Sequence, residues 1–148
     1  MKSVAELLRI KQKANNVISP DALVIDALVM MNDVNLSYLV VMEGEEFKGI
    51  FSERDYTRNV VLKGRKSDTS TVAEVMTTGL PSVAPYDTVE KCMNLLDSHK
   101  TRYLPVFAAN GLVGVVTLND VLRQAIWNKE EVFDQLANKL ADQGDKIF

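Results

Sequence analysis

A hydroxyl residue followed three positions later by aspartate occurs twice in this sequence, each time after a short apolar run. The two occurrences are Ser52 with Asp55 and Thr117 with Asp120, and they lie 65 positions apart. Where a strand gives way to a helix, such a hydroxyl caps the first turn and the carboxylate returns a hydrogen bond to the backbone. A helix N-terminus also attracts anions, and a carboxylate beside it can accept both hydroxyls of a ribose. Each pair therefore indicates either a capping box alone or a site for a sugar phosphate.

Cationic side chains near these pairs are candidates for contacts with phosphate. Arg54 lies inside the first motif, and Arg102 directly precedes the central strand expected in the second half. Their counterparts 65 positions away are Asn119 and Ser37, so the two predicted sites differ in chemistry. Arg54 has an alternative role as a surface partner of a neighbouring glutamate.

Two further pairs of repeated residues carry structural expectations. Gly49 and Gly114 fall inside predicted strands, where glycine often permits the close approach of another group. Arg58 and Arg123 follow the two aspartates by one helical turn. We expect ion pairs at this spacing between each arginine and its aspartate.

The two motifs belong to a repeat that runs through most of the chain. A shift of 65 positions also aligns Pro20 with Pro85 and Tyr38 with Tyr103. Such self-similarity indicates two copies of one supersecondary unit. Half of the chain is too short for a large core of its own. We therefore expect the copies to pack about a pseudo-two-fold axis, to share one core and to form two similar clefts.

The predicted fold class is α/β (α+β), with each repeat in the order strand, helix, strand, strand, helix. Apolar positions at helical spacing and short apolar runs place these elements. In the first copy they are 16–18, 23–31, 38–42, 47–51 and 53–62, and in the second 81–83, 89–96, 104–107, 112–116 and 118–127. A short helix precedes each copy, and a shift of 68 positions aligns the two leading segments. Ser3 and Thr71, each followed three residues later by glutamate, predict capping boxes at their starts.

The predicted organisation has four parts: 1–62, 63–70, 71–127 and 128–148. The first and third are the repeats with their leading helices, and the second is a polar, solvated linker. The fourth is an amphipathic C-terminal helix, whose apolar stripe either packs back on the module or forms a dimer contact.

Composition excludes several classes of protein. The 148 residues carry a net charge of −3 with a pI near 5.2, which leaves no footprint for nucleic acid or an anionic membrane. No apolar run approaches the roughly 18 residues of a membrane span, and the N-terminus lacks the apolar stretch of a signal peptide. The single cysteine, Cys92, lies in an apolar stripe, so we expect it to be buried. These features predict a cytoplasmic protein.

Enzymatic activity is not expected from these residues. The one histidine, His99, lies in a polar helix end, and no cluster has the spacing of metal ligands. The repeated aspartates would lie in separate clefts, where they cannot work as an acid–base pair.

The chain resembles the cystathionine-β-synthase (CBS) domain family, specifically a stand-alone pair of CBS domains. The resemblance covers about residues 3–127 and rests on three motifs in order. They are Val-Ala-Glu-Val-Met-Thr at 72–77, Arg-Tyr-Leu-Pro-Val at 102–106, and Gly-apolar-apolar-Ser/Thr-x-x-Asp in both copies.

The resemblance implies a regulatory module that binds an adenosine compound between the repeats: AMP, ADP, ATP, a NAD-type dinucleotide or S-adenosylmethionine. It implies that Asp55 and Asp120 hold ribose hydroxyls and that Ser52 and Thr117 reach phosphate or ribose. Further implied contacts are Arg102 for phosphate, and Tyr38, Tyr103, Pro105 and the backbone around Ile18 and Val83 for the base.

The same resemblance implies a homodimer that associates through its helices and reports to an unidentified target protein. Because the two clefts differ at Ser37 against Arg102 and at Arg54 against Asn119, we expect unequal occupancy. The alternative is a dimerisation or interaction module that binds no nucleotide, in which the repeated motifs are capping boxes only.

Overall fold

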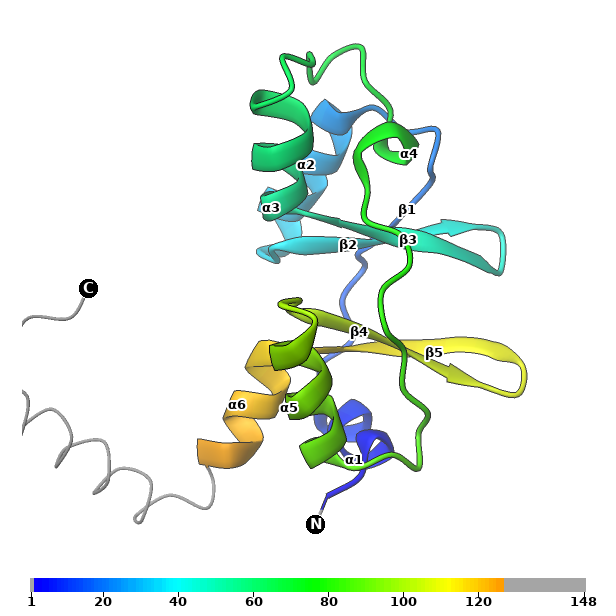
Figure 1. Cartoon of the computed structure of the whole chain (residues 1–148). Coiled ribbons are helices and arrows are strands. Elements are labelled where there is room, and N and C mark those ends of the chain that lie inside the picture. Colours follow the sequence, from blue (N-terminus) through cyan, green and yellow to red (C-terminus); the bar gives the residue numbers. More distant parts are fainter. Residues whose placement is uncertain (1, 127–148) are drawn as a thin grey trace, which may run out of the picture.

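The computed structural model describes residues 2–126, and the C-terminal helix expected at 128–148 lies outside them. Figure 1 shows two similar halves stacked on each other, with helices on one side and long hairpins on the other. The first half contains β1 (Val17–Ile18), α2 (Val24–Val34), β2 (Tyr38–Glu43), β3 (Glu46–Ser52), α3 (Glu53–Asp55) and the π-helix η1 (Tyr56–Val61). The second contains α5 (Val89–Ser98), β4 (Tyr103–Ala108), β5 (Gly111–Thr117) and α6 (Leu118–Ile126). The leading helices are α1 (Val4–Ile10) and α4 (Val72–Val75).

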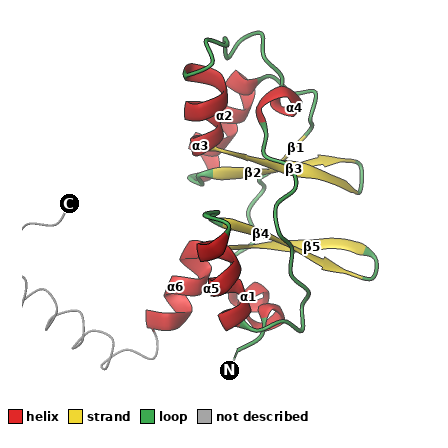
Figure 2. Ribbon diagram, viewed as in Figure 1, coloured by secondary structure: helices red, strands yellow, loops and turns green. Residues whose placement is uncertain are grey.

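The strands form one small sheet in each half (Figure 2). The first sheet has the order β1-β2-β3, with β1 parallel to β2 and β2 antiparallel to β3. In the second sheet β4 pairs only with β5, and the strand expected at 81–83 is reduced to a parallel bridge between Val83 and Val106. The hairpin registers match, because Tyr38 pairs with Ser52 as Tyr103 pairs with Thr117. The repeat therefore places both hydroxyl residues at equivalent strand ends.

The two leading helices are exchanged between the halves. Val4 of α1 lies in the hydrophobic core of the second half, and its amide donates to the carbonyl of Asp87 at 2.9 Å. Val72 of α4 lies in the core of the first half, and its amide donates to the carbonyl of Ala22 at 2.8 Å. The expectation of one shared core is wrong, since each half has its own core. Each is completed by the helix that precedes the other repeat.

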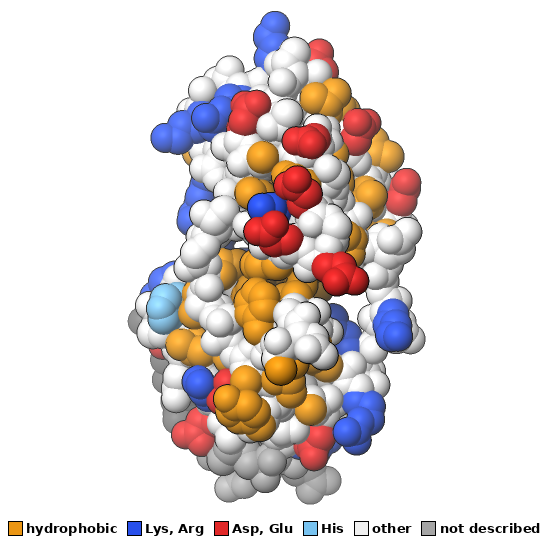
Figure 3. Space-filling model, turned by 90° about the vertical axis from the view of Figure 1, so that its right-hand side faces the viewer, with side chains coloured by type: hydrophobic (Ala, Val, Ile, Leu, Met, Phe, Trp, Pro, Cys, Tyr) orange, Lys and Arg blue, Asp and Glu red, His pale blue; other side chains and the backbone are white. Residues whose placement is uncertain are grey.

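A third apolar cluster joins the halves where the sheets face each other. Tyr38, Val40 and Ile50 of the first sheet are buried there with Val115 of the second. The hairpin face in Figure 3 shows hydrophobic side chains gathered between the halves, below a group of acidic ones. This cluster fixes the distance between the sheets and so the width of the clefts beside them.

The helix ends follow the predicted capping pattern in part. Ser3 forms the expected capping box, because its hydroxyl accepts from the amide of Glu6 while the Glu6 carboxylate accepts from the amide of Ser3. The box predicted at Thr71 is wrong, since its hydroxyl donates to the Glu74 carboxylate at 3.1 Å and accepts nothing from the backbone. The helix expected at 53–62 is present, but most of it is wound as the π-helix η1.

The linker and the cysteine are both tied to the core. Carbonyls of Ser67 and Ser70 accept the amides of Ile25 and Val24 at 2.9 Å each, so the segment 63–70 caps the start of α2. Six of the eight residues of this segment are exposed, as expected of a solvated connection, and Ser70 at its end is buried. Cys92 is fully buried as predicted, and burial raises the pKa of its thiol to about 11.

None of the helices within 2–126 combines the length and the apolar character that a membrane span requires.

Candidate functional site

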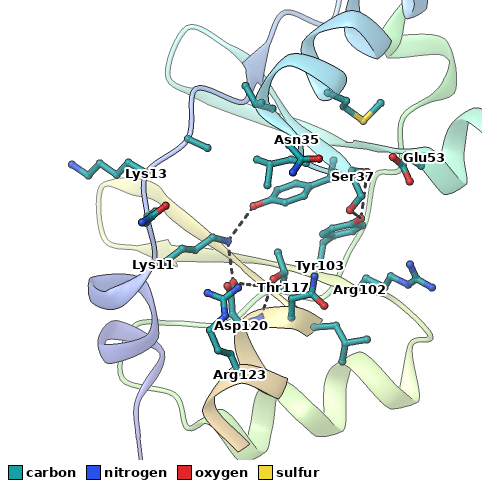
Figure 4. Close-up of a pocket in the computed structure, with 18 of the residues that line it drawn as sticks. Lys11, Lys13, Asn35, Ser37, Glu53, Arg102, Tyr103, Thr117, Asp120 and Arg123 are labelled. Atoms are coloured by element: carbon teal, nitrogen blue, oxygen red, sulfur yellow. Dashed lines mark hydrogen bonds and ion pairs between the residues drawn. The ribbon is translucent and has the colours of Figure 1, made fainter. Parts of the chain in front are cut away.

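A cleft of about 1170 Å³ opens between the halves, next to the second Ser/Thr-x-x-Asp motif. Its walls come from the segment after α1, the end of α2, the start of β2 and the junction of β5 with α6 (Figure 4). It is lined by Ile10, Lys11, Gln12, Lys13, Ala14, Leu28, Met31, Asn32, Val34, Asn35, Leu36, Ser37, Tyr38, Glu53, Arg102, Tyr103, Thr117, Leu118, Asn119, Asp120 and Arg123. Both repeats contribute, so the cleft exists only in the paired arrangement.

Asp120 is held at the edge of this cleft by the capping geometry that the sequence predicts. The amide of Thr117 donates to Asp120 Oδ2 at 2.8 Å, and the Thr117 hydroxyl accepts from the amide of Asp120 at 3.2 Å. These bonds fix the carboxylate where β5 ends and α6 begins. Its side chain is 8% exposed, and within residues 2–126 no hydrogen bond to its Oδ1 is recorded. One oxygen thus remains available to a ligand.

Lys11 is the cation that neutralises this carboxylate. Its ammonium donates to Asp120 Oδ2 at 2.9 Å, to the carbonyl of Val115 at 2.8 Å and to the Tyr38 hydroxyl at 3.1 Å. All three N–H bonds of the ammonium are therefore used. Figure 4 shows the contact of Lys11 with Asp120 as a dashed line. The contacts join the segment after α1 to strands of both halves.

Two aromatic side chains form the inner wall. The rings of Tyr38 and Tyr103, which are equivalent in the repeat, pack with centroids 4.7 Å apart. The Tyr103 hydroxyl lies 2.9 Å from the Ser37 hydroxyl. Burial raises the pKa of Tyr103, so this phenol is neutral at physiological pH. The wall therefore offers apolar ring surface and uncharged hydroxyls.

The cleft is positively charged overall. Four cationic side chains line it, namely Lys11, Lys13, Arg102 and Arg123, against the acidic Glu53 and Asp120. In Figure 4 Arg123 lies beside Asp120, whereas Arg102 extends away from it. Such an excess of positive charge favours an anionic ligand.

The i,i+3 ion pairs expected of the repeated arginines are wrong. Within residues 2–126, neither Arg58 nor Arg123 forms a salt bridge. The two aspartates have other partners, since Lys11 pairs with Asp120 and neutral groups surround Asp55. Arg123 is therefore left facing the cleft.

Both oxygens of the equivalent carboxylate of the first repeat accept hydrogen bonds from the protein. Asp55 Oδ2 accepts from the amide of Ser52 at 2.9 Å and from its hydroxyl at 3.0 Å, and Oδ1 accepts from the hydroxyl of Thr77. Thr77 reaches it because its backbone pairs with Ile50 on β3. Gly49 permits that approach, since a β-carbon there would lie 2.5 Å from the Thr77 carbonyl. Asp55 lines neither of the two larger clefts.

The structure brings together about half of the residues that the sequence marks as nucleotide-binding. The large cleft is lined by Ser37, Tyr38, Arg102, Tyr103, Thr117, Asn119 and Asp120. The residues outside its lining are Ile18, Ser52, Arg54, Asp55, Val83 and Pro105.

Arg54 lies at a second, smaller opening of about 480 Å³ between η1, α5 and α6. Its guanidinium donates to the carbonyl of Lys100 at 2.9 Å, so it pairs with neither neighbouring glutamate. Arg102 and Leu118 line both openings.

Several lining residues escaped prediction from the sequence. Lys11 carried a signal, because it occupies a helically spaced position after Val4, Leu7 and Leu8 where an apolar residue is expected. Asn35 ends α2 in the left-handed conformation, with φ of 55°, and thereby forms part of the rim. Among residues 2–126 no cluster of three or more histidine, cysteine, aspartate or glutamate side chains is arranged to hold a metal ion.

Comparison with known sequences identifies the repeats. The sequence model of the CBS domain matches residues 5–62 and again residues 72–126. The CBS domain-containing protein CBSX3, mitochondrial, of Arabidopsis thaliana is 33% identical over 121 residues. That match covers 78% of this chain and 59% of the Arabidopsis protein, so the chain spans little more than half of that relative.

Solved structures show the same arrangement. A putative signal-transduction protein with CBS domains from Burkholderia ambifaria superimposes with a TM-score of 0.81 at 32% identity, covering 87% of this chain and 97% of that one. CBSX2, solved in complex with AMP, superimposes with a TM-score of 0.71 at 24% identity, covering 86% and 99%. With two matched repeats and this shared fold, the chain belongs to the CBS domain family as a tandem CBS pair.

Proposed function

We propose that this chain is a regulatory module that binds an adenosine nucleotide in the cleft beside Asp120 and passes the signal to a partner protein. The proposed ligands are AMP, ADP, ATP and NAD-type dinucleotides. The observation that carries the proposal is the Asp120 carboxylate, which is buried at the start of α6 with Oδ1 free of donors from residues 2–126. Such an oxygen accepts a ribose hydroxyl. CBSX2, a chain of the same fold, holds AMP in its structure.

The surroundings of Asp120 fit the rest of such a ligand. The cations on the rim, among them Arg123 and Lys13, suit the phosphate. Apolar side chains from the end of α2, such as Met31 and Val34, suit the base. The cleft exceeds the volume that a drug-sized ligand needs, about 300–1,000 Å³, so it accommodates a nucleotide with more than one phosphate.

The two motifs are proposed to play different roles. Asp120 meets a displaceable ammonium and keeps one oxygen open, whereas Asp55 is closed by Ser52 and Thr77. We therefore expect one nucleotide per chain, with Asp55 acting as a structural cap.

Replacing Asp120 by asparagine tests this assignment. Asp120→Asn keeps an acceptor for the Thr117 amide but removes the charge, and a hydrogen bond to a charged group contributes about 1.5–3 kcal/mol. We expect the dissociation constant for the bound nucleotide, measured by calorimetry with AMP, ATP and NADH, to rise about 10- to 100-fold. Asp55→Asn is the matched control and should leave the affinity within about threefold of the wild type.

Equal nucleotide affinities of the wild type and Asp120→Asn would contradict the assignment of Asp120 to the binding site.

A thermal shift screen separates the proposal from the alternative of an interaction module with empty clefts. A ligand that binds the folded state at 100 times its Kd adds about 2.7 kcal/mol to stability. If none of the adenosine compounds raises the melting temperature, the interaction module is the correct function.

The helical face is the proposed dimer contact. Figure 1 places α2, α3, α5 and α6 on the same side of the molecule. Large apolar side chains are exposed on these helices and on η1, including Val29 at 54%, Met93 at 47% and Leu122 at 46%. An apolar surface spread over both repeats is typical of a contact with a second copy of the chain.

A lysine at Val29 tests the dimer. Val29→Lys places a charge within the proposed contact, so we expect a dimeric wild type to become monomeric in sedimentation equilibrium. Val113→Lys alters a valine of similar exposure, 52%, on β5 and should remain dimeric. Dissociation by Val113→Lys but not by Val29→Lys would move the contact to the hairpin face.

A further inference from the structure

The Lys11 ammonium occupies the oxygen of Asp120 that a ribose would need for a two-point contact. A vicinal diol engages a carboxylate best when each hydroxyl donates to a separate oxygen. Oδ1 of Asp120 is open, but Oδ2 already accepts from Lys11 and from the Thr117 amide. Lys11 is only 24% exposed, so its charge is shielded from water in this position.

This arrangement is specific to one of the two repeats. The shift of 68 positions that aligns the leading segments pairs Lys11 with Gly79, which has no side chain. The carboxylate of Asp55 accordingly meets the neutral hydroxyl of Thr77 instead of a cation. The competition for the carboxylate therefore exists only at Asp120.

We infer that Lys11 is an internal competitor for Asp120 that makes the cleft select nucleotides over nucleosides. The inference rests on the proposed function and deepens it. A ribose that takes both oxygens displaces the ammonium, which then needs another anion. A phosphate on the same ligand supplies that anion, whereas a nucleoside does not.

The contacts of Lys11 allow this exchange without unfolding. Lys11 begins the segment without regular structure between α1 and β1. The hydrogen bonds that its ammonium donates to the Val115 carbonyl and the Tyr38 hydroxyl need not break. Only the bond to Asp120 is replaced. The selectivity therefore comes from one side chain whose partner changes from a carboxylate to a phosphate.

Calorimetry of adenosine and AMP with the wild type and Lys11→Met tests the inference. Methionine keeps the length of the side chain but cannot occupy Oδ2 or hold a phosphate. We expect Lys11→Met to bind adenosine about tenfold more tightly and AMP about tenfold more weakly, because a hydrogen bond to a charged group is gained or lost in each case. The dissociation constant for adenosine divided by that for AMP then falls by about 100-fold.

Lys13→Met is the matched control, since Lys13 lines the same cleft and has no recorded hydrogen bond or ion pair with the described residues. It removes the same charge and should not tighten adenosine binding. Lys11→Gln, which keeps a donor but no charge, replaces Lys11→Met if the latter does not fold by circular dichroism. The glutamine variant is also expected to lower the ratio.

Three outcomes are decisive. Weaker AMP binding in the Lys11 variant, together with tighter adenosine binding in that variant but not in Lys13→Met, supports the competitor. An unchanged ratio in a protein that binds AMP overturns the competitor and leaves the proposed function standing. No binding of adenosine, AMP, ATP or NADH to any of the proteins overturns both.

Discussion

Phe51→Ala is expected to lower the free energy of unfolding by about 3–5 kcal/mol, the range for truncating a buried phenylalanine. Phe51 is fully buried on β3 and is among the largest of the fully buried side chains within residues 2–126. It lies in the same core cluster as Val24 of α2, Val60 of η1 and Val72 of the exchanged helix α4. Removing the ring leaves a cavity among elements that cannot all collapse into it.

Urea denaturation followed by circular dichroism measures this loss as a lower midpoint at constant slope. For a chain of this size the melting temperature should fall by about 3 °C for each kcal/mol. Phe47→Ala on the same strand is the control. That ring is only partly buried and packs edge-on against Phe107 with centroids 5.7 Å apart, so its loss should amount to about 1–2 kcal/mol. Equal losses of unfolding free energy in Phe51→Ala and Phe47→Ala would contradict the central place of Phe51 in the core of the first half.

Gly49→Ala is expected to cost about 3 kcal/mol, at the upper end of the range for overpacking. The new β-carbon would lie 2.5 Å from the carbonyl oxygen of Thr77. That oxygen accepts from the amide of Ile50, and the amide of Thr77 donates to the carbonyl of Ile50, so the backbone of Thr77 is held on both sides. Relief therefore requires the segment at residue 77 to move away from β3. That movement also withdraws the Thr77 hydroxyl from Asp55.

Gly114→Ala is the matched substitution at the equivalent position of the second repeat. There the β-carbon would meet the end of the Leu8 side chain at 2.9 Å, which can rotate aside. Alanine is also favoured over glycine in a strand by about 0.5–1 kcal/mol. We expect Gly114→Ala to remain within about 1 kcal/mol of the wild type in thermal and urea denaturation. A larger loss for Gly114→Ala than for Gly49→Ala would contradict the close contact at Thr77.

Features that depend on neighbouring residues could be predicted from the sequence. The hairpins and the capping geometry of Thr117 with Asp120 follow from the repeat and its period. The close contacts at Gly49 and Gly114 could also be predicted, because a glycine inside a strand often permits another group to approach the backbone. At Thr71 the local rule failed, since the glutamate that should return to the backbone is engaged by the threonine hydroxyl instead.

Features that depend on distant residues could not be predicted in this way. Lys11 is 109 positions from Asp120, and no local pattern connects them. The different fates of the two aspartates likewise depend on which side chain arrives from the segment after each leading helix. Arg54 lies within the motif by sequence, yet its side chain leaves the cleft for the carbonyl of Lys100. The sequence shows that the clefts differ, but the packing determines which one is open.

The exchange of α1 and α4 has a consequence for how the chain is assembled during synthesis. α1 emerges from the ribosome before the elements it packs against, because its docking site includes Asp87 and the core around Val121, more than 80 residues later. α1 must therefore wait without its partner while the first half is completed by α4. Contacts so distant along the chain form slowly, because a long loop has to close before they contribute. A helix that precedes both repeats is thus among the last parts of the pair to pack, and the cleft beside Lys11 forms only with that final step.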